Sequence, residues 1–204
     1  MRSKQFPFYF ARNKLVYFGL TLLILGGFWL GTRVATQVPR TLKNNVLIAG
    51  SVEKFNFLAS QNSNKCGMVM ENFEANIEGE RIQGSCCGVM DLHRYQEQVE
   101  GLKKFSDISV VPQDPYDIPV SLAKGLFEYQ KNITLNEEQQ KIYDEATEMS
   151  HEGGPCCCMC WRWTAFEGQA KFLITEHNFT ADQISEVWDL EDGCGGSGHA
   201  TEHS

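Results

Sequence analysis

Four cysteines lie within five residues of one another, at Cys156, Cys157, Cys158 and Cys160. Core packing does not require this density, because a buried cysteine behaves as a small hydrophobe that other residues can replace. The pattern indicates either several sulfurs that converge on a metal ion or one segment that disulfides join to several others. Soft thiolates suit Cu(I), and a tetrahedral set of thiolates suits Zn²⁺.

The remaining cysteines are compatible with both the metal site and the disulfide framework. They are Cys66, Cys86, Cys87 and Cys194, and two histidines near the cysteines, His93 and His151, are further candidate ligands. Free amides at a helix N-terminus stabilise thiolates, and we expect helices to begin after the Cys86–Cys87 pair and at the cluster. Each of the four outlying cysteines could join the metal site or form a disulfide with one member of the cluster.

A third interpretation is thiol–disulfide exchange, because Cys157 and Cys160 form a C-x-x-C sequence. Thioredoxin-type enzymes surround that motif with alternating strands and helices, and this chain lacks such a pattern. No motif marks the nucleophile, base and oxyanion donors of a hydrolase. We therefore expect a binding protein rather than an enzyme.

The cluster also resembles a known motif. The run from Pro155 to Cys160 has the P-C-x-C-x-C spacing of the PCYCGC-motif family of bacterial exported proteins, with Cys157 and Met159 in place of Tyr and Gly. The likeness extends over about residues 155–196 and includes the segment that begins at Phe179. It implies an exported, cysteine-rich, metal-binding protein without an established reaction.

Charge and hydropathy divide the chain into segments. The first 52 residues contain no Asp or Glu, whereas all 26 acidic residues and 11 of the 18 basic ones follow, which gives that part a net charge of −15. An acidic surface disfavours nucleic acid as a partner and attracts cations. The uncharged apolar run 15–32 predicts a transmembrane signal anchor in the cell membrane. The predicted segments are a cytoplasmic 1–14, the anchor 15–32, a stalk 33–52, an extracytoplasmic cysteine-rich α-helical domain 53–196 and a disordered tail 197–204.

Apolar spacing within the domain is mostly helical. We expect helices over about 90–105, 120–131, 134–149, 158–177 and 180–190, and a small β-element near 46–83. Thr134 to Glu137 and Thr180 to Gln183 have the sequence of capping boxes, which predicts that helices begin there. If the fourth helix begins inside the cluster, Cys156, Cys157 and Cys160 share one face.

The fold class expected from the sequence is therefore mainly α, a single N-terminal transmembrane helix followed by a small Cys-rich helical extracytoplasmic domain. The expected function is binding of Cu(I) or Zn²⁺ for capture, storage or hand-over, with a metal donor or acceptor protein as partner. The alternatives are a thiol–disulfide oxidoreductase and a disulfide-stapled subunit of a larger membrane assembly.

Overall fold

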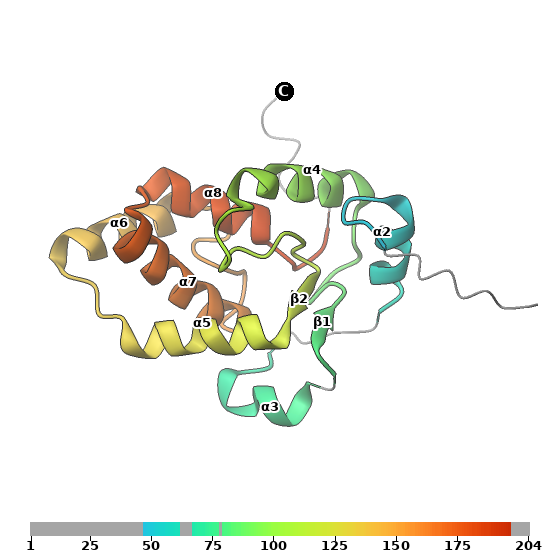
Figure 1. Cartoon of the computed structure of the whole chain (residues 1–204), viewed down its shortest axis with the longest axis horizontal. Coiled ribbons are helices and arrows are strands. Elements are labelled where there is room, and N and C mark those ends of the chain that lie inside the picture. Colours follow the sequence, from blue (N-terminus) through green and yellow to red (C-terminus); the bar gives the residue numbers. More distant parts are fainter. Residues whose placement is uncertain (1–46, 62–66, 78, 197–204) are drawn as a thin grey trace, which may run out of the picture. The chain divides into compact units, whose positions relative to one another are not determined.

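The computed structural model describes residues 47–61, 67–77 and 79–196, and these are mainly helical (Figure 1). In chain order the elements are α2 (Val52–Ala59), the 3₁₀ turn η1 (Met70–Asn72), α3 (Phe73–Asn76), β1 (Arg81–Gln83), α4 (Leu92–Leu102), the 3₁₀ turn η2 (Lys103–Phe105), β2 (Asp117–Pro119), α5 (Val120–Asn132), α6 (Glu137–Met149), α7 (Trp161–His177) and α8 (Ala181–Glu191).

Helix α7 is the centre of the core and packs along α5, while α8 packs against α4 and α6. Figure 1 shows α5 and α7 side by side and α4 next to α8. Gly168 permits the close approach of α7 to α5, since a Cβ there would lie 2.0 Å from the carbonyl oxygen of Leu126. The largest buried side chains on the two C-terminal helices are Trp161 and Trp188. The N-terminal end of α7, where the cysteine cluster lies, is thereby fixed in the core.

The short strands β1 and β2 pair antiparallel, with Ile82 opposite Ile118. The sequence predicts a β-element near 46–83, which fits β1, but its partner β2 lies in a proline-containing stretch that reads as a loop. Both isoleucines are buried, and this burial holds the two strands together. Directly after β1 the chain enters the segment that contains Cys86 and Cys87.

Two predicted helix starts need correction, whereas the starts of α5 and α8 are confirmed. The capping box that opens α8 pairs Thr180 with Gln183, as its sequence predicts. The box of α6 instead pairs Asn136 with Gln139, two residues beyond the predicted position, because the Asn136 side chain accepts the N–H of Gln139. Helix α7 begins after the cluster, with Cys160 as its N-cap in extended conformation. The prediction that the cluster sulfurs share a helix face is therefore wrong.

The expected fold class also needs correction. Within the described part of the chain, no helix combines the length and the apolar character that crossing a membrane requires. The longest, α7, has 17 residues, which span only about 26 Å at 1.5 Å per residue, and it carries Arg162, Glu167 and Lys171. The predicted anchor 15–32 lies outside the described residues. The finding is a mainly helical fold without a membrane-spanning helix among the residues described.

Candidate metal centre

Three segments that are distant in sequence bring the cysteines together. Cys86 and Cys87 follow β1, the cluster of four lies between α6 and α7, and Cys194 follows α8. The first and last segments are joined by backbone hydrogen bonds, here called the 86–89/193–196 pairing. The N–H groups of Cys86 and Gly88 donate to the carbonyls of Gly193 and Cys194 at 2.8 and 2.6 Å. This pairing sets Cys194 beside the Cys86–Cys87 pair.

A buried arginine fixes the position of Cys194. Arg162, in the first turn of α7, is only 2% exposed and donates from Nη2 to the carbonyl of Pro115 at 2.7 Å. Its guanidinium lies against the backbone of Gly193, where a Cβ would be 2.4 Å from Cζ. Sequence reasoning did not select either residue. The available signal was an arginine two positions after the last clustered cysteine and a glycine directly before Cys194.

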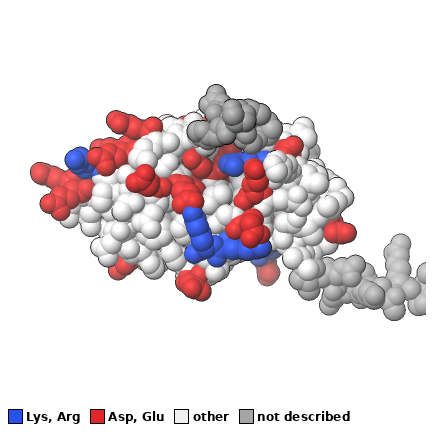
Figure 2. All heavy atoms as spheres, turned by 90° about the horizontal axis from the view of Figure 1, so that it is seen from above, with Lys and Arg blue, Asp and Glu red and all other residues white. Residues whose placement is uncertain are grey.

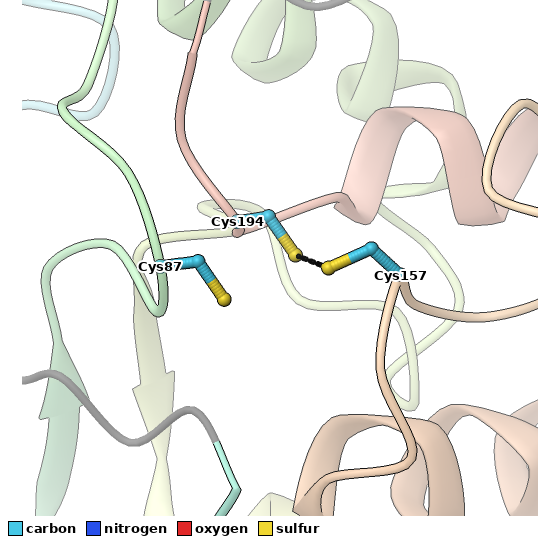
Figure 3. Close-up of side chains that lie close together, drawn as sticks. All are labelled: Cys87, Cys157 and Cys194. Atoms are coloured by element: carbon cyan, nitrogen blue, oxygen red, sulfur yellow. Dashed lines mark hydrogen bonds between the residues drawn. The ribbon is translucent and has the colours of Figure 1, made fainter.

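One group of sulfurs reaches the surface and is here called the exposed group. It contains Cys87, Cys157 and Cys194, whose Sγ atoms all lie within 4.8 Å of one another. Figure 3 shows that the three side chains come from three separate segments and bring their sulfurs close together. The Sγ atoms of Cys157 and Cys194 are 3.0 Å apart. Cys87 and Cys157 are exposed, whereas Cys194 is buried.

A second group lies deeper and is here called the buried group. The Sγ atoms of Cys156, Cys158 and Cys160 also lie within 4.8 Å of one another. Cys156 and Cys160 are 2% and 1% exposed, and their sulfurs are 3.8 Å apart. Cys86 lies beside these three, close enough for its thiol to interact with that of Cys160, and is taken as the fourth member. The group therefore offers four sulfurs, which is the number that a structural zinc ion takes.

Cys156 connects the two groups. Its Sγ lies 3.8 Å from that of Cys160 in the buried group and 3.7 Å from that of Cys194 in the exposed group. The seven described cysteines are not joined by disulfides and form one continuous set of thiols. No described sulfur is isolated from this set.

The electrostatics of the set single out one thiolate in each group. The pKa of Cys160 is lowered because the Cys156 thiol donates a hydrogen bond to it, with further contributions from Cys86 and from the backbone amide of Arg162. The pKa of Cys194 is lowered mainly by a hydrogen bond from Cys156 as well. Cys156 itself has a raised pKa, because its proton is held by these anions. A metal ion can displace these shared protons, since thiolates are the ligating form.

Both predicted histidine ligands lie outside the two groups. The His93 Nε2 contacts Glu97 on the exposed face of α4 at 3.1 Å. The His151 Nδ1 lies 3.4 Å from an Asp189 carboxylate oxygen. Cys66 lies outside the described residues. The candidate ligands that the structure brings together are therefore all cysteines, namely Cys86, Cys87, Cys156, Cys157, Cys158, Cys160 and Cys194.

The two cysteines of the C-x-x-C sequence belong to different groups. Cys157 faces Cys194 and Cys87, whereas Cys160 faces Cys156, Cys158 and Cys86. A redox pair needs its two sulfurs next to each other, because the disulfide bond is only about 2.05 Å long. This arrangement provides no support for exchange chemistry between Cys157 and Cys160.

One face of the described part of the chain is rich in acidic side chains. Figure 2 shows acidic side chains across the face seen there, gathered at the end where α6 lies. Helix α6 carries Glu137 and Glu138 in its first turn. Basic side chains lie among the acids rather than in a patch of their own. Such a surface raises the local concentration of cations.

Comparisons of the chain with protein-family models, with curated proteins and with solved structures found no match. The resemblance of Pro155–Cys160 to the PCYCGC motif thus stays a prediction. The two cysteine groups could hold a metal ion, and the function is argued from their chemistry alone.

Proposed function

We propose that this protein binds a soft metal ion, Zn²⁺ or Cu(I), through clustered thiolates and acts in its capture, storage or hand-over. The observation that carries the proposal is the convergence of seven cysteines from three segments into two adjoining groups of sulfurs. Zn²⁺ and Cu(I) prefer such soft ligands, whereas Mg²⁺ and Ca²⁺ prefer oxygen.

The sulfur spacing supports a metal rather than a packing role. Thiolates about 2.3 Å from a tetrahedral ion lie about 3.8 Å apart. The Sγ atoms of Cys156 are 3.8 Å from Cys160 and 3.7 Å from Cys194, so both distances match that edge. The Cys156 sulfur is thus at the spacing that coordination requires from one sulfur of each group, whereas the Sγ atoms of Cys157 and Cys194, 3.0 Å apart, must separate when an ion binds.

The composition of the groups bears on which ion is preferred. The two groups consist of cysteine sulfurs, while Met68 and Met90 are buried and Met159 is 75% exposed. Methionine thioether ligands would favour Cu(I). A tetrahedral set made of thiolates alone suits Zn²⁺. Zn²⁺ is therefore the first ion to test.

The positive charge of the buried Arg162 also favours a metal–thiolate centre. A Zn²⁺ ion with four thiolates carries a net negative charge, which is costly to bury without compensation. The interaction with Cys160 and burial raise the pKa of the Cys86 thiol, and the guanidinium of Arg162 partly opposes this rise. Arg162 is thus placed to stabilise a negatively charged metal–thiolate centre.

The direct test is mass spectrometry of the full chain, purified without chelator or reductant. We expect a native mass that includes metal and a denatured mass in which the thiols are reduced. A metal-free protein whose denatured mass is lower by two hydrogens for each of several bridges would refute the proposal. That outcome would instead indicate a disulfide-stapled module. As an internal control, metal loading after reduction and chelation should restore the native mass.

A variant pair separates metal binding from thiol exchange. Cys160→Ser removes a buried-group ligand and is expected to reduce the metal content. Under the exchange alternative, Cys157→Ser and Cys160→Ser would abolish reduction of a model disulfide equally. Activity of that kind in the wild type, lost in both variants while the metal content stayed unchanged, would contradict the proposal.

A further inference from the structure

The two cysteine doublets divide between the two groups in the same way. Cys86 and Cys156 belong to the buried group, while their neighbours Cys87 and Cys157 belong to the exposed group. Each of these pairs of adjacent cysteines thus supplies one thiol to each of the two groups.

The number of ligands suggests two ions with a shared sulfur. Two ions with four thiolates each need one ligand position more than the seven described cysteines supply. Cys156 can fill that position, since it lies at 3.8 and 3.7 Å from one sulfur of each group. A thiolate has lone pairs for two metal ions, and a bridge through Cys156 completes four ligands on both sides.

Solvent access differs between the two positions. The buried group includes Cys86, Cys156 and Cys160, which are 4%, 2% and 1% exposed. The exposed group presents Cys87 and Cys157 to solvent, where an incoming thiol can reach the ion. The surrounding protein shell controls such access and thereby the rate of ligand exchange.

We propose that the described thiols form one centre for two soft metal ions, in which Cys156 bridges a retained ion in the buried group and an exchangeable ion in the exposed group. This rests on the proposed function and specifies how hand-over works. A soluble thiol ligand replaces Cys87 or Cys157 on the exposed ion, while the buried ion stays in place and maintains the site. On loading, each ion displaces the remaining thiol protons to solvent. On hand-over, the incoming thiol binds the ion as a thiolate, and its proton passes to the cysteine thiolate that leaves the ion.

The test uses the reduced full chain loaded with Zn²⁺ and a coloured chelator in excess. We expect two ions per chain in the native mass and release in two phases of equal amplitude. The exposed ion should leave at least about tenfold faster than the buried one, because access controls exchange. One ion per chain, or two ions released in a single phase, would overturn the two-ion proposal but leave metal binding intact. A chain that binds no Zn²⁺ would refute the proposed function itself.

Variants assign the two phases. Cys157→Ser and Cys87→Ser change exposed residues, so they should fold normally and lose only the fast phase. They serve as controls for each other, because both should give the same result. Loss of the slow phase in both would contradict the assignment of the buried ion.

The bridge has its own signature. With a spin-half cadmium isotope in place of Zn²⁺, the wild type should give two cadmium NMR signals that are coupled through the shared sulfur. Cys156→Ser should abolish that coupling, because the serine oxygen does not bridge soft ions. Two uncoupled signals in the wild type would overturn the bridging role of Cys156.

Discussion

Gly193→Ala tests whether the contact between Arg162 and the Cys194 segment controls both stability and metal binding. The added Cβ would lie 2.4 Å from Cζ and Nη2 of Arg162, far inside contact distance. Arg162 cannot retreat easily, because it is buried and its Nη2 donates to the carbonyl of Pro115 at 2.7 Å. Either the guanidinium loses this hydrogen bond or the segment that carries Cys194 moves.

Three contributions set the expected change in the free energy of unfolding for Gly193→Ala. A lost hydrogen bond of a charged group costs about 1.5–3 kcal/mol. Overpacking in a tight core adds about 1–3 kcal/mol. Replacing glycine by alanine restricts the unfolded chain and offsets about 0.4–1 kcal/mol of this. We therefore expect Gly193→Ala to lower the free energy of unfolding by about 2–5 kcal/mol, and to weaken the exposed metal position because Cys194 is displaced.

The assay is urea unfolding of the full chain, followed by the fluorescence of the buried Trp161 and Trp188, with and without Zn²⁺. The matched control is Gly125→Ala in α5, where a Cβ meets nothing within 4 Å. That control should stabilise the protein by about 0.5–1 kcal/mol, since alanine favours a helix over glycine. If Gly193→Ala unfolds at the wild-type urea concentration or above it, the steric argument and the role of Arg162 are refuted.

Three further predictions concern pH and metal removal. Burial raises the pKa of Glu191 well above its usual range, so wild-type stability should fall as pH rises from about 4.3 toward that raised value. Glu191→Gln should remove this fall and be more stable than the wild type at neutral pH in urea unfolding, and a parallel pH profile would contradict it. Burial acts to raise the pKa of Asp117, but hydrogen bonds from Arg81 and Lys54 outweigh burial and hold this pKa below its usual value. The Asp117 carboxylate therefore stabilises the fold fully above about pH 3.9, and this contribution is lost as the pH falls through the lowered pKa. Asp117→Asn should cost about 3–5 kcal/mol at neutral pH because it leaves Lys54 buried without its charge partner, and thermal unfolding that matches the wild type at pH 7 would disprove it. Removing metal with a chelator should speed hydrogen exchange at the backbone amides of the 86–89/193–196 pairing, as measured by mass spectrometry. The amides at the interface between α5 and α7 should remain protected. Uniform loss of protection would show instead that the metal stabilises the whole fold.

Local signals in the sequence predicted the helices well. The capping box at Thr180 and Gln183 was correct because both partners lie within one turn, so the chain segment itself contains the whole interaction. The box predicted at Thr134 was wrong because Asn136 competes for the same role and its side chain accepts the N–H of Gln139. Helix existence was thus predicted from spacing, while the first residue depended on which side chain closes the cap.

The helix after the cluster shows where local reasoning failed. Spacing predicted that it begins near Cys158, but Cys160 is its extended N-cap. The N–H of Trp161 instead donates to the carbonyl of Met68 at 2.6 Å. This long-range contact is invisible in a local pattern, and it keeps the cluster out of the helix so that its sulfurs can face two sides.

The sequence by itself determined that the chain after residue 52 is acidic and rich in cysteine, and its apolar spacing predicted a mainly helical fold there. It also placed four candidate ligands close together, at Cys156, Cys157, Cys158 and Cys160. Only the tertiary structure decided which cysteines meet. Cys194 reaches Cys157 across 37 positions of sequence because α8 returns along α4 and α6, and Arg162 and the 86–89/193–196 pairing then fix the loop that follows. The tertiary structure also places both histidines outside the two groups: His93 contacts Glu97 on α4, and His151, in the turn after α6, contacts Asp189. Residue type sets which ions a site can hold, but the number of ligands and their separation depend on contacts between distant segments, which no local pattern encodes.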